Sequence, residues 1–168
     1  TVPASEIFTS LQTGAIDAAE WVGPYNDVSL GLHRVAKYYY YPGWHEPGPM
    51  IQCIINRDAW NSLPEDLQEI VRVSCQAANL DMQSEYMHGN ARALEQLKQD
   101  PDVQILPLPD DVLSLLQGLT AEVMSELVAR DPWSARMQQS FEAFQRVSQP
   151  NQAISEQAYL NARTVSVK

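Results

Sequence analysis

Two short clusters that pair a glutamate with a tryptophan are the residues of this sequence best suited to binding chemistry. The first is Glu20-Trp21, just before a Gly-Pro break, and the second is Trp44-His45-Glu46, in a stretch rich in proline and glycine. A glutamate oxygen can bind a hard cation, and a backbone carbonyl can supply a further ligand. An indole ring offers an apolar wall and one N–H donor. Together these groups suit a small ligand with one charged end and an apolar body.

Each cluster also has a plainer interpretation. A glutamate beside a tryptophan is more often a surface carboxylate next to a half-buried ring, and perturbed carboxylates also arise in purely structural pairs. His45 could be a loop residue bonded to a carbonyl, and the run Tyr38–Tyr41 is more simply a strand whose rings alternate between the two faces.

Catalytic motifs are missing from the sequence. It contains no glycine-rich phosphate loop, no G-x-S-x-G elbow and no H-E-x-x-H pair. The three histidines, His33, His45 and His88, are far apart, and none begins a metal-ligand pair. A metal-dependent hydrolase built from Glu20, His45 and Glu46 is the weakest hypothesis, because these residues lack ligand-like spacing. The sequence therefore predicts a binding protein rather than an enzyme.

The composition narrows the class of partner. With 11 basic and 21 acidic residues the chain of 168 residues carries a formal net charge of -10, which argues against binding to nucleic acid. No run of 18 apolar residues is present, so no membrane span is expected. There is no N-terminal secretion signal, so the chain is cytosolic, already processed, or cut from something longer.

Cys53 and Cys75 are expected to be two buried free thiols, with a single bridge as the alternative.

The elements that would position the two clusters are short strands among longer helices. Four segments have a strand-like composition: Ala15–Val22, Tyr38–Tyr41, Met50–Ile55 and Val103–Leu108. Periodicity and end signals predict helices over Thr1–Gly14, Asn26–Leu32, Pro64 to about Gln99, Asp110 to Asp131, Ser134–Val147 and from about Asn151 onward. Three or four strands are too few for a complete doubly wound sheet. The sequence thus predicts a helix-rich α/β fold that is part of a larger domain.

The longest predicted helix raises a question of packing. From Pro64 to Gln99 it would be roughly 54 Å long, more than a compact domain of this size spans. We therefore expect part of it to pack against something else or to bend near Gly89. Its apolar stripe is expected to be ordinary core.

Several strings of the sequence resemble one protein family. They are Gly14–Asp27, Ala36–Pro49, Leu63–Val71, Ala78–Met82 and Ser155–Arg163. These strings are similar to the periplasmic solute-binding proteins of tripartite ATP-independent periplasmic (TRAP) transporters, in the branch that binds 2-oxo acids and related monocarboxylates. The resemblance covers nearly the whole chain, and it is carried most specifically by the first two strings.

The resemblance implies a two-lobed receptor whose cleft closes on a small organic anion together with a sodium or calcium ion. The family's Glu-Trp pair falls on Glu20 and Trp21, with the Glu20 carboxylate and the Trp21 backbone carbonyl on the cation and the indole against the substrate. Tyr25 and His45 are matched to substrate binding and Glu46 to the metal, less firmly. A cation makes physical sense, because an anionic ligand beside Glu20 would be repelled in a low-dielectric cleft unless a positive charge lay between them.

The sequence also departs from the family's pattern. The family's chains are longer, and their substrate-gripping arginine, their cation-binding glutamine and their signal peptide lie N-terminal to anything present here. The chain therefore resembles the C-terminal half of such a receptor, with long C-terminal helices, and by itself it is expected to bind ligand weakly or not at all. The expected localisation is periplasmic. The alternative is a helical oligomerisation fragment with no ligand of its own.

The resemblance also predicts how the chain is divided and what it binds. Residues 1–36 would belong to the second lobe and carry the ligand motif, residues 37–131 would hold the crossover strands and the long helix, and residues 132–168 would form C-terminal helices that dimerise. The expected partners are the small anion, the TRAP membrane permease subunits, and a second copy in a homodimer or helix-swapped oligomer.

Overall fold

The computed structural model describes residues 1–44, 48 and 51–164, and it separates into two compact units, residues 1–109 and residues 110–168. The first unit contains α1 (Ala4–Thr13), α2 (Pro24–Ser29), the 3-10 helix η1 (Leu32–Arg34), β1 (Tyr38–Tyr41), α3 (Arg57–Asn61), α4 (Glu65–Gln99) and β2 (Gln104–Pro107). The second contains α5 (Asp110–Arg130), α6 (Pro132–Ile154) and α7 (Glu156–Arg163). This confirms a helix-rich α/β chain with few strands. The predicted divisions at residues 36 and 131 refer to lobes of a longer protein and stay predictions.

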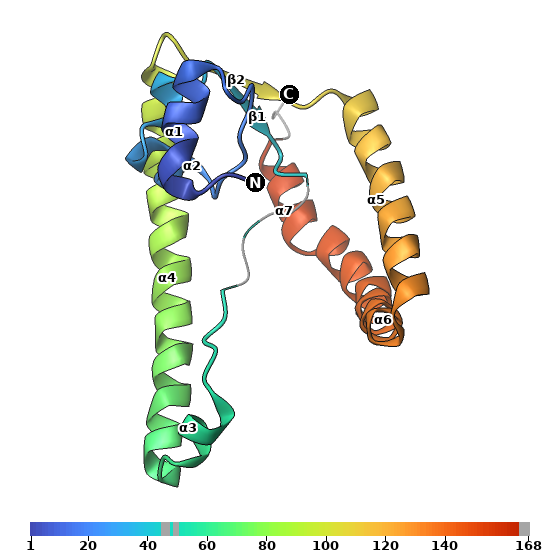
Figure 1. Cartoon of the computed structure of the whole chain (residues 1–168). Coiled ribbons are helices and arrows are strands. Elements are labelled where there is room, and N and C mark those ends of the chain that lie inside the picture. The colour runs from blue at the N-terminus through green and yellow to red at the C-terminus, as the bar shows by residue number, and fades with distance from the viewer. Residues whose placement is uncertain (45–47, 49–50, 165–168) are drawn as a thin grey trace. The chain divides into compact units, whose positions relative to one another are not determined.

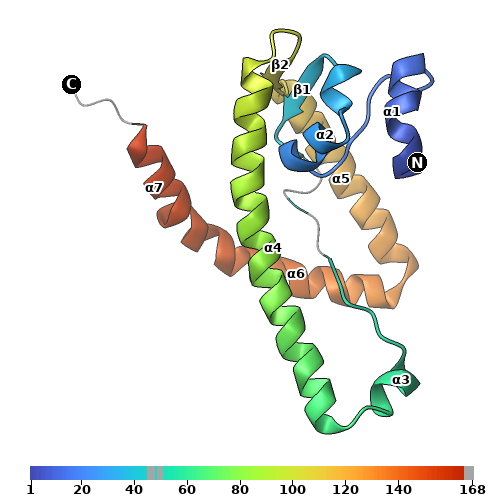
Figure 2. The same cartoon turned by 90° about the vertical axis from the view of Figure 1, so that its left-hand side faces the viewer.

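The longest element, α4, confirms the predicted long helix. It has 35 residues and begins after Pro64, with Glu65 and Asp66 in its first turn, where acidic side chains interact favourably with the positive end of the helix dipole. Figures 1 and 2 show it as one continuous helix. Gly89 does not interrupt it and instead lets another element approach closely, as described below.

The core of the first unit gathers at the C-terminal end of α4. Its buried apolar residues are Ile7 of α1, Leu32 of η1, and Ala93 and Leu97 of α4. Leu97 is only 1% exposed. By contrast, the N-terminal half of α4 exposes apolar side chains, so the expectation that its whole stripe is core is wrong. The reason is that α2 and the strand pair contact only the far end of the helix.

The two strands form one parallel pair, which confirms two of the four predicted strands. β1 pairs with β2 in a register that sets Tyr39 opposite Ile105. Of the β1 tyrosines only Tyr39 is turned inward; Tyr38, Tyr40 and Tyr41 are exposed. The expected alternation of inward and outward rings therefore fails at Tyr41, which is exposed. A sheet of only two strands is too narrow to cover both Tyr39 and Tyr41.

Two predicted strands are wrong. Residues 15–22 form an irregular loop between α1 and α2, and residues 51–55 are extended but pair with no described strand. A strand is stable only where a neighbouring strand satisfies its backbone N–H and C=O groups. In the described part of the chain neither segment has such a neighbour, and Ile54 is 88% exposed as a result. Met50, the first residue of the second prediction, lies outside the described residues.

A short helix that the sequence did not predict, α3, turns the chain into α4. The Asn56 side chain accepts hydrogen bonds from the N–H groups of Asp58 and Ala59 and so caps the start of α3. Gln68 of α4 donates to the carbonyls of Trp60 and Leu63, at 3.0 and 3.1 Å. These bonds hold α3 against the first turns of α4 (Figure 2).

The two cysteines differ from expectation. Both are free, but both are exposed rather than buried. The extended segment that carries Cys53 runs alongside α4, which carries Cys75, in both views (Figures 1 and 2). A hydrogen bond with the Cys53 thiol raises the pKa of Cys75. The expectation of burial failed because it assumed that the apolar run 50–55 would be packed on both faces.

The second unit consists of three helices in sequence. α5 matches its prediction, with Asp110 and Asp111 in its first turn. α6 runs past Pro150 to Ile154, beyond its predicted end at Val147, and α7 therefore begins at Glu156 rather than near Asn151. A proline inside a helix removes one backbone hydrogen bond, and the helix ends soon afterwards, where Ser155 turns the chain.

None of the described residues in α5, α6 or α7 is buried. Large apolar side chains are left exposed along all three helices, among them Leu115, Val123, Trp133, Phe141, Phe144 and Tyr159. By length and composition alone, α5 is also long and apolar enough to cross a membrane, although the sequence predicted no such segment. Exposed apolar surface is a common feature of faces that bind another protein surface.

Candidate functional site

The Glu20-Trp21 pair lies in the loop between α1 and α2, and not at the end of a strand as expected. Glu20 is exposed and Trp21 is partly buried. The indole Nε1 of Trp21 is buried, and it has no hydrogen-bond partner among the described residues. The loop thus presents one carboxylate and one indole N–H donor whose partner is not supplied by the described chain.

The second acid–aromatic cluster is described only at its first residue. Trp44 is exposed, three residues after the end of β1. His45 and Glu46 lie outside the described residues. The roles of His45 and Glu46 therefore stay predictions.

A buried acid, Asp27, lies next to the Glu20-Trp21 loop. The Asp27 side chain belongs to α2 and is 8% exposed. The hydroxyl of Tyr39, on β1, donates to Asp27 Oδ2 at 2.6 Å. Burial raises the pKa of Asp27, and the hydrogen bond from Tyr39 opposes that rise. Burial and the Asp27 carboxylate together raise the pKa of Tyr39 far above its ordinary value.

Sequence reasoning assigned no role to Asp27. The signal that could have found it is the spacing Gly23-Pro24-x-x-Asp27, an acid in the first turn of a helix. Such an acid is normally explained by the helix dipole, so nothing in the sequence distinguished it from an exposed one. Its hydrogen-bond partner, Tyr39, is 12 residues away in the sequence.

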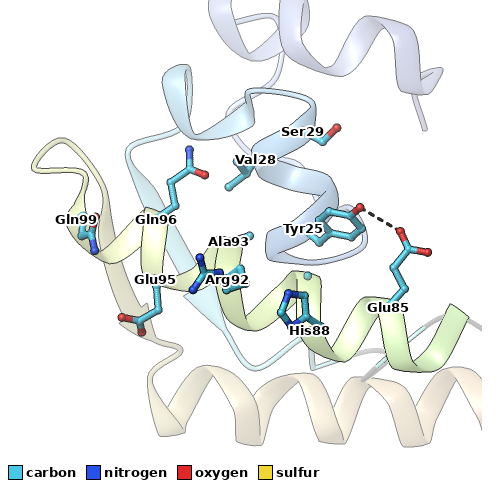
Figure 3. A pocket seen from close by; sticks show the side chains of 11 residues that line it. Tyr25, Val28, Ser29, Glu85, His88, Arg92, Ala93, Glu95, Gln96 and Gln99 are labelled. Atoms are coloured by element: carbon cyan, nitrogen blue, oxygen red, sulfur yellow. Dashed lines mark hydrogen bonds between the residues drawn. The ribbon is translucent and has the colours of Figure 1, made fainter. Parts of the chain in front are cut away.

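Tyr25 fastens α2 to α4. Its backbone N–H donates to Asn90 Oδ1 at 3.0 Å, and its hydroxyl donates to Glu85 Oε1 at 3.1 Å. The Tyr25 ring lies so close to Gly89 that a Cβ atom there would be 2.8 Å from the ring. The hydrogen bond to Glu85 raises the pKa of Tyr25. The side chain predicted to contact substrate is thus engaged with the long helix (Figure 3).

An open groove of about 650 Å³ lies between α2 and α4, where Figure 3 shows the side chains that line it. Its walls carry charges of both signs. The lining residues are Tyr25, Val28 and Ser29 from α2, and Glu85, His88, Gly89, Arg92, Ala93, Glu95, Gln96 and Gln99 from α4. Neither Glu20 nor Trp21 lines it, so the groove and the predicted ligand loop are separate features of the first unit.

The described residues fit a cation only in part. Glu20 offers carboxylate oxygens and Trp21 a backbone carbonyl, which are the ligand types that sodium-like and calcium-like hard cations use. A calcium ion takes 6–8 oxygen ligands. The described part of the chain contains no group of three or more His, Cys, Asp or Glu side chains that could hold a metal ion. These two residues could therefore hold a cation only together with ligands from elsewhere.

Comparison with known proteins agrees with the resemblance seen in the sequence. The family model DctP, described as bacterial extracellular solute-binding protein, family 7, matches residues 1–131. A monocarboxylate 2-oxoacid-binding periplasmic protein of Nostoc sp. (strain PCC 7120) is 36% identical over 160 residues, which is 95% of this chain and 44% of that protein. These relatives are binding proteins and not enzymes, as the sequence predicts.

Solved structures of similar proteins share the fold. A TRAP periplasmic solute-binding protein from Colwellia psychrerythraea with bound calcium and pyruvate is 39% identical, with a TM-score of 0.92 over 96% of this chain and 49% of that chain. One from Pseudoalteromonas atlantica T6c with bound sodium and pyruvate is 35% identical, with a TM-score of 0.90 over 98% of this chain and 50% of that chain. The chain thus spans about half the length of the proteins it matches.

Proposed function

This chain belongs to the bacterial extracellular solute-binding proteins of family 7, and we propose that it supplies the C-terminal part of a TRAP-transporter receptor for a 2-oxo acid or related monocarboxylate. The observation that carries the proposal is the close match, over nearly the whole chain, to two structures that hold pyruvate with calcium or sodium. In this proposal the receptor is periplasmic and delivers its ligand to the membrane permease subunits of the transporter.

Within the proposed site Glu20 and the Trp21 carbonyl bind the cation, and the Trp21 indole packs against the organic anion. The sign of the charges explains why a cation is needed. Two carboxylates 4 Å apart repel each other by about 4 kcal/mol at an effective dielectric constant of about 20. A sodium or calcium ion between Glu20 and the ligand replaces that repulsion with two attractions. When bound, the ion supplies this charge compensation and needs no redox chemistry of its own.

The other predicted site residues enter the proposal with different support. Tyr25 already holds α2 against α4 through Glu85 and Asn90. Its proposed contribution is therefore to fix the base of the ligand loop and to offer the ring as part of the wall. His45 is proposed for substrate binding and Glu46 for the cation on the strength of the sequence strings alone.

The proposal is tested by calorimetric titration of pyruvate in sodium and in calcium buffers. The titration uses this chain alone and the protein expressed from its complete open reading frame. The complete protein should bind pyruvate only with a cation present, and this chain should bind weakly or not at all because it offers an incomplete ligand set. Substituting Glu20→Gln should weaken pyruvate binding in both the sodium and the calcium buffer, because it removes one ligand of the cation. Asp17→Asn is the matched control, because Asp17 is an exposed acid in the same loop.

Two results would contradict the proposal. One is pyruvate binding by the complete protein that is the same with and without cation. The other is an equal loss of affinity in Glu20→Gln and Asp17→Asn, which would mean that general negative charge, and not a ligand at position 20, governs binding.

Self-association is a second candidate activity, and the exposed apolar residues of the second unit favour it. We propose that α5, α6 and α7 mediate contact with a second copy, as a homodimer or a helix-swapped oligomer. The same observation favours the alternative of a helical oligomerisation fragment that binds no ligand of its own. Ligand titration separates the two, since only the receptor gives a cation-dependent signal.

A further inference from the structure

The two cysteines of the first unit have no role in the binding chemistry proposed above. Cys53 lies in the extended segment 51–55 and Cys75 in the N-terminal half of α4, and both are free and exposed. Both thiols are therefore accessible to reagents in solution. What the pair can do depends on how close together the fold holds the two side chains.

The first turns of α4 hold the end of the extended segment in place. Gln68 of α4 donates to the backbone carbonyls of Trp60 and Leu63. The guanidinium group of Arg72 lies over the Trp60 ring, 5.2 Å from its centroid. The N–H of Trp60 in turn donates to the Asn56 carbonyl at 2.9 Å. Two successive turns of α4 thus hold α3, and with it the end of the extended segment.

Cys75 continues the face of α4 that makes these contacts. Gln68, Arg72 and Cys75 have the spacing i, i+4 and i+7, which sets them on one side of the helix. Cys75 lies about 10 Å beyond Gln68 along the helix axis. Cys53 comes three residues before Asn56, and three residues of extended chain also span about 10 Å. Because the segment runs alongside α4 in both views (Figures 1 and 2), these matching spans bring the two thiols to a similar level of the helix.

The exposure of the neighbouring isoleucines indicates which side of the segment is covered. In extended chain, successive side chains point to opposite sides. Ile54 is 88% exposed, against 68% for Ile51 and 40% for Ile55. Cys53 therefore shares the more covered side with Ile51 and Ile55. A hydrogen bond between the thiols of Cys53 and Cys75 agrees with this placement.

We propose that Cys53 and Cys75 are a site of disulfide formation, which ties the extended segment to α4 where the chain meets an oxidising pool of small disulfides such as oxidised glutathione. The thiolate of one cysteine attacks oxidised glutathione, forms a mixed disulfide and releases one glutathione thiolate. The second cysteine attacks the protein sulfur of that mixed disulfide and releases the second glutathione thiolate. The two protons of the cysteines pass to the released thiolates, so two protein thiols are oxidised while one oxidised glutathione is reduced.

This inference goes beyond the proposed function and does not depend on its ligand. Disulfides persist in the bacterial periplasm, which is the compartment proposed for this receptor. A bridge from Cys53 to Cys75 would close a loop that contains α3 and the first turns of α4. Constraining such a loop in the unfolded chain stabilises the folded chain.

The first test maps the disulfide directly. This chain, and the protein expressed from its complete open reading frame, are equilibrated at low concentration with oxidised and reduced glutathione in defined ratios. The remaining thiols are alkylated, and the protein is digested without reduction for mass spectrometry. The expected product is a pair of peptides joined through Cys53 and Cys75, with a yield that does not change with protein concentration. Free thiols or glutathione on each cysteine in the oxidising buffers, or a bridge only between two chains, overturns the proposal.

A matched control moves the second thiol around the helix. The double substitution Cys75→Ser with Ala77→Cys turns the thiol to the opposite side of α4, because two residues rotate a helix by about 200°. Positions 75 and 77 are both exposed. The control should take up glutathione and form no internal bridge. An equal yield of internal bridge in the control and in the unchanged chain overturns the proposal, because the segment would then not be held along one face of α4.

The second test compares the thermal unfolding of the bridged and the reduced chain. The bridge should raise the unfolding midpoint by roughly 5–10 °C, because it closes a loop of about 20 residues in the unfolded chain. Cys53→Ala and Cys75→Ala should each unfold at the same temperature in oxidising and reducing buffer. An unchanged or lower midpoint in the bridged chain contradicts the proposal, because it would mean that the native fold must distort to bring the two thiols together.

Discussion

The C-terminal end of α4 and the three helices of the second unit show two different ways in which this chain handles its apolar residues. At the end of α4, the chain buries Ala93 and Leu97 with its own α2, η1 and strand pair. In α5, α6 and α7 no described residue is buried, although apolar side chains recur at helical spacing along them. Apolar residues thus recur at helical spacing in both regions, but only the C-terminal end of α4 is packed against other elements of its own unit.

Amphipathic periodicity therefore predicts that a helix forms, but not which surface packs against its apolar face. The first unit has a small local core and, attached to it, the loop that carries Glu20 and Trp21. Within the second unit, α5, α6 and α7 bury none of their described residues against one another.

The largest effect is expected at Leu97, which has the smallest exposed fraction among the described core residues, 1%. Leu97→Ala should lower the free energy of unfolding by about 2–5 kcal/mol, the usual range for a buried leucine. The matched control is Leu115→Ala in α5, where the side chain is 63% exposed and the change should stay within about 0.5 kcal/mol. Denaturant unfolding followed by circular dichroism measures both, and equal losses would contradict the contrast between the regions.

Two helical glycines, Gly89 in α4 and Gly118 in α5, should respond to substitution by alanine with changes in stability of opposite sign. A Cβ at Gly89 would lie 2.8 Å from the Tyr25 ring, whereas a Cβ at Gly118 in α5 would have nothing within 4 Å. Gly89→Ala should therefore destabilise by about 1–2 kcal/mol, because overpacking outweighs the gain in helix propensity. Gly118→Ala should stabilise by up to about 1 kcal/mol. Thermal unfolding of the two variants tests the opposite signs, and a shared sign would show that the close approach of α2 is not rigid.

Self-association should depend on the second unit and not on the first. Phe141 and Phe144 of α6 are exposed, and the double substitution Phe141→Glu and Phe144→Glu should convert an associated species to monomer in light scattering. The control is Ile51→Glu with Ile54→Glu, two exposed apolar residues of the first unit. A monomer at high concentration before any substitution would remove the prediction altogether.

The smallest effect concerns the two thiols along α4. A hydrogen bond with Cys53 raises the pKa of Cys75, so at a pH near 8 less of Cys75 is thiolate than that pH would otherwise give. Cys53→Ala removes this hydrogen bond and should therefore increase the rate at which iodoacetamide alkylates Cys75. Mass spectrometry of the labelled peptide measures the rate. An unchanged rate would show that the extended segment does not hold Cys53 against the helix.

Much of the secondary structure could be predicted from local signals. Pro64 with two following acids marks the start of α4, and Gly14, with a left-handed φ of 72°, ends α1. The strands could be predicted less reliably than the helices, because a strand needs a partner strand elsewhere in the chain. Tyr38–Tyr41 and Gln104–Pro107 are strands because they pair with each other, whereas residues 15–22 had similar local features and no neighbour to pair with. A strand depends on distant residues, and so its local composition was not sufficient.

The family could be identified from the sequence, because the strings around Glu20 and Trp21 match it in residue type and order; the role of these two residues as ligands stays a prediction. The sequence also determined most helix ends, since caps, prolines and dipole-matched acids act over a few residues. The three-dimensional structure was needed to show that Asp27 is buried and bonded to Tyr39, that the Tyr25 ring contacts Gly89, and that α5, α6 and α7 bury no described residue among themselves. These features arise from contacts between distant parts of the chain, or from their absence in the described part, and no local pattern encodes either.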